Sequence, residues 1–136
     1  MDDRFLYVYC WGTGEMQQYD VTDPRKPKLA GSVHIGGIAR RTAHPSGKSY
    51  AGGPQMVEIS RDGKRVYVTN SLYTPWDRQF YPDGIRGWLA KINVDPRGGM
   101  ALDRDFFLDL HDRPGGPARA HEVRLQGGDC TTEIFP

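Results

Sequence analysis

Apolar and polar side chains alternate over short stretches of this chain, a pattern that predicts β-strands rather than helices. The first stretch, Phe5–Trp11, is rich in aromatic and β-branched residues, and glycines follow it at once. The same pattern predicts strands at Met16–Val21, Lys28–Ile35, Met56–Ser60, Arg65–Asn70, Trp88–Val94, Phe106–Leu110 and His121–Leu125. The best helical segment is Thr74–Tyr81, and Pro75 within it and Pro82 after it limit it to about one turn. The pattern therefore predicts an all-β chain.

Two parts of the pattern repeat along the chain. Arg4–Val8 resembles Lys64–Val68, and Gln18–Pro24 resembles Lys91–Pro96. Four-stranded units that recur at about the separation between these matched segments are typical of β-propeller blades. A plain antiparallel sandwich is the alternative. Asp62-Gly63 supplies the positive φ that a tight turn inside such a unit needs.

The position of the strands within the repeat predicts about two blades in residues 1–136. Residues 54–112 supply all four strands of one blade. Residues 1–38 supply three, so the innermost strand of that blade would precede Met1. Residues 120–125 would form the inner strand of a closing blade. The chain is therefore expected to start and stop in the middle of a blade, so that strands from an N-terminal region would be needed to complete the propeller.

Composition and charge exclude several classes of partner. The net charge of +1 gives no electrostatic case for binding nucleic acid. No apolar run is long enough for a transmembrane helix. The compartment stays open: a true start at Met1 implies a cytoplasmic protein, whereas a missing upstream leader would allow a periplasmic one. The two cysteines, Cys10 and Cys130, could form one disulfide but not a framework.

Several longer motifs resemble the selenium-binding protein / methanethiol oxidase family, in its C-terminal portion. The most distinctive is Trp76-Asp77-Arg78-Gln79-Phe80-Tyr81-Pro82-Asp83. Others are Gln18-Tyr19-Asp20-Val21-Thr22-Asp23-Pro24, Gly52-Gly53-Pro54-Gln55-Met56, Ala120-His121-Glu122-Val123-Arg124 and Gly127-Gly128-Asp129-Cys130. The resemblance implies a seven-bladed propeller. It also implies copper-dependent oxidation of methanethiol to formaldehyde, hydrogen sulfide and hydrogen peroxide, and selenium binding in some members.

Histidine is a natural copper ligand, and His121 is the residue that the resemblance favours for this role. It would open an innermost strand that lines the central channel, with Glu122 on the opposite face. A hydrogen-bonded structural histidine is the alternative. His34, His44 and His111 are expected to be solvated.

The segment between Tyr73 and Arg86 carries Trp76, Asp77, Phe80 and Tyr81. It could cover the mouth of a pocket and exclude water, or it could be a packed surface loop. Asp77 could orient a histidine near the metal by accepting a hydrogen bond from its ring. Cys10 and Cys130 are candidate soft ligands for selenium or copper, although a cysteine within a strand is often a small buried apolar residue.

Three functions follow as hypotheses. The chain is part of a thiol oxidase that is inactive as an isolated fragment, or a propeller module that binds selenium or a protein without turnover. The third is a non-functional gene fragment.

Overall fold

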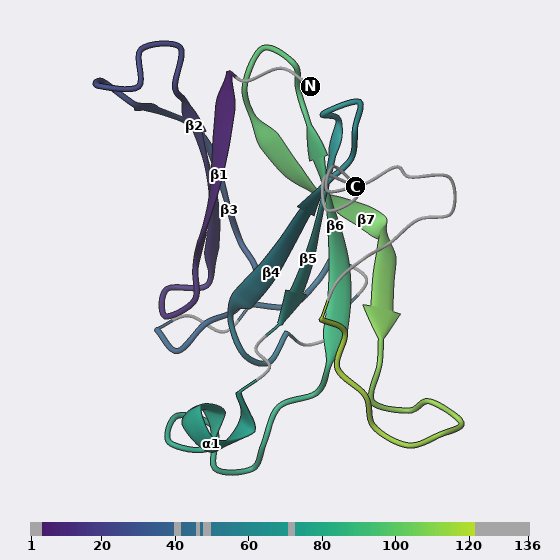
Figure 1. Ribbon diagram of the computed structural model, residues 1–136. Helices are drawn as coiled ribbons and strands as arrows, with labels where there is room; N and C mark the ends of the chain where they lie inside the picture. The colour runs from purple at the N-terminus through teal and green to yellow at the C-terminus, as the bar shows by residue number, and fades with distance from the viewer. Residues whose placement is uncertain (1–3, 40–41, 46, 48–49, 71–72, 122–136) are drawn as a thin grey trace, which may run out of the picture.

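The computed structural model describes residues 4–39, 42–45, 47, 50–70 and 73–121, and these form two antiparallel sheets (Figure 1). The first sheet has the order β1-β2-β3, with β1 at Phe5–Cys10, β2 at Glu15–Asp20 and β3 at Lys28–His34. The second has the order β4-β5-β6-β7. Its strands are β4 at Pro54–Ile59, β5 at Arg65–Asn70, β6 at Trp88–Val94 and β7 at Met100–Asp109. The prediction of an all-β chain in two antiparallel sheets is confirmed.

Strand β7 is longer than the sequence pattern predicted. It begins at Met100 rather than at Phe106, because the turn after β6 closes tightly. Gly98 N–H donates to Asp95 O, and Asp95 N–H donates to Gly99 O, each at 3.0 Å, so pairing resumes at once. The charged residues 103–105 hid the first half of this strand in the sequence. A register shift between Ala90 and Ile92 divides the two halves of the β6–β7 ladder.

The core lies between the facing sides of the two sheets, where β1 packs against β4 and β3 against β7. Strand β5 is buried along nearly its whole length, as expected of a central strand. The fully or nearly buried apolar cluster comprises Met16, Ile35, Tyr50, Val66, Val68, Trp88, Ala90, Ile92 and Val94.

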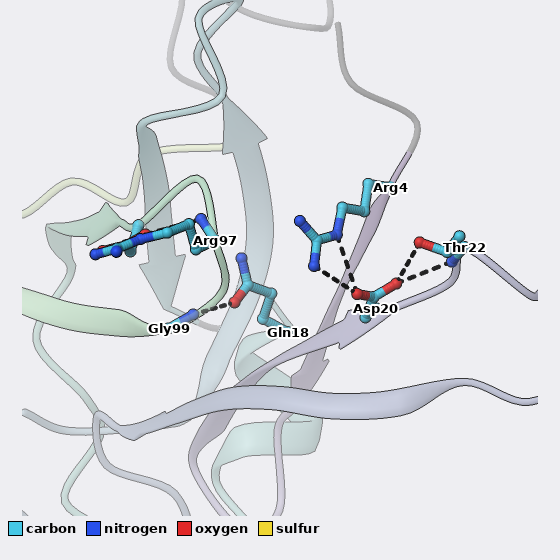
Figure 2. Close-up of polar contacts among 7 residues, drawn as sticks. Arg4, Gln18, Asp20, Thr22, Arg97 and Gly99 are labelled. Carbon is cyan, nitrogen blue, oxygen red and sulfur yellow. Dashed lines mark hydrogen bonds and ion pairs between the residues drawn. The ribbon is translucent and has the colours of Figure 1, made fainter.

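A buried amide also joins the sheets. The side chain of Gln18, on β2, is fully buried; it accepts a hydrogen bond from Gly99 N–H at 2.8 Å and donates one to Tyr7 Oη at 3.1 Å. Figure 2 shows the first of these bonds beside the Arg4–Asp20–Thr22 contacts.

The connection from β3 to β4 contains a buried histidine, which corrects the expectation that His44 is solvated. His44 is 1% exposed, and its ring contacts Tyr50 and Phe107 at centroid distances of 5.7 and 4.9 Å. Its Nε2 lies 2.9 Å from Asp103 O, which is a hydrogen bond with the ring nitrogen as donor. Polar flanking residues hid this packing, since the ring fills a gap that only the tertiary fold creates.

Helix is nearly absent from the described residues, as predicted. The single turn α1 spans Thr74–Asp77, inside the segment where a turn of helix was expected. No helix in the described part of the chain is long and apolar enough to cross a membrane.

Candidate functional site: an aromatic pocket at the α1 end of the sheets

The site is built at one end of the two sheets, where β1 and β5 end and β4 and β6 begin (Figure 1). The connection between β5 and β6 leaves this end and carries α1. The side chain of Asn70, the last residue of β5, holds the base of this connection against the sheet. The fully buried Asn70 amide donates to Arg86 O at 2.6 Å and to Ala51 O at 3.0 Å, and it accepts from Trp88 N–H at 3.1 Å. Both ends of the connection are thereby fixed to the sheet.

Local backbone contacts explain the shape of this connection. Pro75 lies in the first turn of α1, where its missing N–H costs no helical hydrogen bond. Tyr81 N–H then donates to Asp77 O at 2.8 Å, and Gly84 N–H donates to Tyr81 O at 2.8 Å. The loop therefore folds back as a series of turns.

Three aromatic rings attach the loop to the end of β1. The Trp11 ring lies 6.2 Å from that of Trp76 and 5.5 Å from that of Phe80, and the latter two are 5.7 Å apart. The tilted and edge-on arrangements are those that aromatic pairs prefer. Gly53, just before β4, passes so close to the Trp11 carbonyl oxygen that a Cβ would clash with it. The sequence analysis singled out Trp76 and Phe80 as loop aromatics and placed Trp11 in the first strand, not beside this loop.

A pocket of about 650 Å³ lies beside this cluster. Its wall contains the rings of Tyr9, Trp11, Tyr73 and Trp76, together with Pro75 and the carboxamides of Gln55 and Gln79. None of these lining side chains is charged. The pocket suits a small, uncharged and largely apolar ligand, because nothing in the wall would offset the desolvation of a charge.

Of the four loop residues singled out from the sequence, only Trp76 lines this pocket. Phe80 supports it through the ring cluster, and Tyr81 is 6% exposed within the loop's own packing. Asp77 is 1% exposed and turns into the protein, where its carboxylate accepts a hydrogen bond from Arg119 at 2.7 Å. That partner is a guanidinium, and the expected histidine partner for Asp77 stays a prediction.

His121 lies two residues beyond Arg119, exposed and outside any strand. The rest of the strand expected at residues 121–125, including Glu122, falls outside the described residues. Among the described residues no three histidine, cysteine, aspartate or glutamate side chains cluster closely enough to hold a metal ion. His121 can thus offer one imidazole, and these residues do not form a copper site by themselves.

Among the described residues, neither the other histidines nor Cys10 line the pocket. His34 Nε2 is 3.2 Å from Glu15 Oε1 on the neighbouring strand, and His111 follows β7 with its N–H bonded to Asp109. Cys10 is half-buried at the end of β1. Cys130 lies outside the described residues, so a disulfide with Cys10 stays untested.

Comparison with known proteins gives a consistent result. The sequence pattern of the family described as 56 kDa selenium-binding protein matches residues 1–136. Methanethiol oxidase from Xenopus tropicalis is 44% identical over 99% of this chain, and selenium-binding protein 1 from Arabidopsis thaliana is 41% identical over the same share. The chain covers 33% and 32% of those proteins, so it spans about a third of their length, as their C-terminal portion.

A solved structure agrees with the sequence comparisons. The X-ray structure of a hypothetical selenium-binding protein from Sulfolobus tokodaii matches with a TM-score of 0.86 and 55% identity, over 96% of this chain and 28% of that one. The similarity extends from the sequence motifs to the arrangement of both sheets. This chain therefore belongs to the 56 kDa selenium-binding protein family.

Proposed function

We propose that this chain is the C-terminal portion of a methanethiol oxidase. The observation that carries the proposal is the uncharged aromatic pocket at Trp11 and Trp76. Methanethiol is small, neutral and apolar, and divalent sulfur makes favourable contacts with aromatic rings. The relatives named methanethiol oxidase align over 99% of the chain, which supports the same substrate.

The proposed reaction converts methanethiol, oxygen and water to formaldehyde, hydrogen sulfide and hydrogen peroxide. The carbon loses two electrons, which reduce oxygen to peroxide, and water supplies the oxygen atom of formaldehyde. The C–S bond breaks and the sulfur leaves as hydrogen sulfide. In this proposal the aromatic rings bind the methyl and thiol groups and exclude bulk water from them.

Copper is part of the proposal as the redox-active metal. His121 would supply one imidazole ligand, and the other ligands would come from residues outside the described part of the chain. Selenium binding is proposed for Cys10 or Cys130, whose thiolates are soft ligands.

The active unit is proposed to be a seven-bladed propeller of which the two sheets are neighbouring blades. In the described part of the chain the first sheet has three strands where the second has a fourth, and the relatives are about three times as long. A region corresponding to their N-terminal two thirds would supply that strand and the remaining blades. The isolated chain is therefore expected to be inactive.

The test compares the isolated chain with the chain joined to the part of the Sulfolobus tokodaii protein that precedes its matching 28%. Both are loaded with copper, and hydrogen peroxide and hydrogen sulfide are measured on addition of methanethiol. We expect turnover only from the joined protein, with loss of copper in its His121→Ala variant. Copper content and turnover unchanged by His121→Ala would reject the ligand role.

The alternative is a propeller module that binds selenium or a protein without turnover. The Arabidopsis thaliana relative is named for selenium binding, and the half-buried Cys10 offers a thiol. Stoichiometric selenium bound by the joined protein, and lost in Cys10→Ser or Cys130→Ser, would favour this alternative if no peroxide is released.

A further inference from the structure

A carboxylate–guanidinium pair joins the loop of the pocket wall to the segment that precedes His121. Asp77 Oδ2 and Arg119 Nη1 are 2.7 Å apart, and the side chains are 2% and 21% exposed. The residues are 42 positions apart in the chain. The pair is thus a long-range contact between the loop and the segment that follows β7.

At the loop end, Asp77 of the pair is adjacent in α1 to Trp76 of the pocket wall. Trp76 is 52% exposed and lines the pocket, whereas the adjacent Asp77 is 1% exposed. Adjacent residues on a helix point about 100° apart, so holding one fixes the other. A single helical turn without a side-chain cap has little stability of its own. The bond from Asp77 therefore helps to hold Trp76 in the pocket wall.

At the other end, backbone packing holds Arg119 in place. A Cβ on Gly87, just before β6, would clash with the carbonyl oxygen of Ala118. Ala118 N–H also donates to Leu110 O at 2.9 Å. The backbone beside Arg119 is therefore fixed against the four-stranded sheet, and its side chain reaches from there to the loop.

We propose that Asp77 and Arg119 are positioning residues that set the aromatic pocket wall and the His121 segment in one fixed arrangement. This inference rests on the proposed function, in which the pocket takes the thiol and His121 contributes to the metal site. Neither Asp77 nor Arg119 lines the pocket. Its effect is to keep Trp76 and the imidazole of His121 at a constant separation.

The energetics of buried ion pairs provide a way to separate positioning from stability. Removal of one partner leaves an uncompensated buried charge, which is more costly than removal of both. Arg119→Met should therefore lower stability more than the double variant Asp77→Asn/Arg119→Met does. If the pair also positions Trp76, the double variant should regain stability without regaining the geometry of the pocket.

The experiment uses the 136-residue chain and dimethyl sulfide, an unreactive neutral thioether, as the probe. The Trp76 indole and His121 imidazole resonances are followed by nuclear magnetic resonance during titration, and the unfolding midpoint is measured for each variant. Arg119→Lys serves as the conservative variant. Arg86→Met is the matched control, because Arg86 forms exposed ion pairs with Asp109 and Asp112.

In Arg119→Met and in the double variant we expect the dissociation constant for dimethyl sulfide to rise about tenfold or more, and both resonances to shift before probe is added. Arg119→Lys should bind within about threefold of the original chain, because the lysine ammonium can donate to Asp77 in place of Nη1. Arg86→Met should change neither resonance nor affinity.

Recovery of both stability and affinity in the double variant would show that the pair is only structural and would overturn the inference, while the proposed function would stand. An unmoved His121 resonance in Arg119→Met would also overturn it. If the original chain does not bind dimethyl sulfide at Trp76, the pocket assignment in the proposed function is wrong, and the inference fails with it.

Discussion

The side-chain oxygen of Gln18 lies 2.8 Å from the backbone nitrogen of Gly99 and accepts its hydrogen bond, which connects strand β2 of one sheet to the β6–β7 turn of the other (Figure 2). The amide nitrogen of Gln18 donates to Tyr7 Oη on β1. One fully buried polar side chain thus makes use of both its donor and its acceptor.

Gln18→Met should lower the free energy of unfolding by about 1–3 kcal/mol. The new side chain has a similar shape but leaves Gly99 N–H and Tyr7 Oη without this partner. Urea unfolding of the chain measures the effect. Gln17→Met, on the opposite face of β2, should cost less, and equal losses in the two variants would contradict the role given to Gln18.

Stability should fall as the pH is lowered from about 4 toward about 2. Hydrogen bonds from Thr22, followed by those from Arg4, lower the pKa of Asp20 to about 2. Lys91, with Asn93 and two backbone N–H groups, lowers the pKa of Asp103 to about 2. Because both folded-state pKa values lie below the ordinary aspartate value, these carboxylates stabilise the fold above that value and stop doing so as they are protonated.

Unfolding midpoints in urea at several pH values between 5 and 2 test this dependence. Asp103→Asn should be less stable than the original chain at pH 6 and should lose less stability on acidification. A variant with the same slope as the original chain would show that Asp103 is not one of the groups responsible.

Tyr50→Phe should leave stability unchanged or raise it by about 1 kcal/mol. The Tyr50 hydroxyl is buried and has no hydrogen-bond partner among the described residues, and burial raises its pKa above the ordinary tyrosine value. Its ring packs edge-on against Trp88 at 4.8 Å, and phenylalanine keeps that contact. A loss of more than about 1 kcal/mol in thermal or urea unfolding would reveal a partner for the hydroxyl.

Trp11→Ala should expose the loop between β5 and β6 to proteolysis. The ring contacts of Trp11 with Trp76 and Phe80 contribute about 1–3 kcal/mol to docking of the loop, so cleavage by trypsin after the exposed Arg78 should accelerate about tenfold. Trp11→Phe should retain most of the protection. Equal cleavage rates in all three chains would mean that the ring cluster does not hold the loop.

The fold could be predicted largely from the sequence, because short alternating stretches and glycine-rich turns are local signals. The start of β7 was missed because its charged residues are held by cross-strand partners such as Lys91 on β6, which no local pattern reveals. The burial of His44 was missed for the same reason: its environment is made by residues distant in the chain, such as Phe107.

The site could be predicted only in part. The aromatic loop was recognisable from its composition, and Trp76 does line a pocket. The other wall, from Tyr9, Trp11 and Gln55, depends on how the two sheets pack, and so does the pairing of Asp77 with Arg119. Such contacts between segments 20 or more positions apart require the tertiary structure. The strand expected to follow His121 stays a prediction.

The two ends of the sheets contain different structural features (Figure 1). The end with the β6–β7 turn contains the Gln18–Gly99 bond between the sheets, and the end with α1 contains the pocket. Asn70 holds the base of the α1 loop through backbone groups of Arg86 and Trp88, whatever side chains the tip of the loop carries. Residues at the tip can therefore vary without disturbing strand pairing. Evolution could therefore alter ligand preference at one end of this protein while the other preserves its foldability.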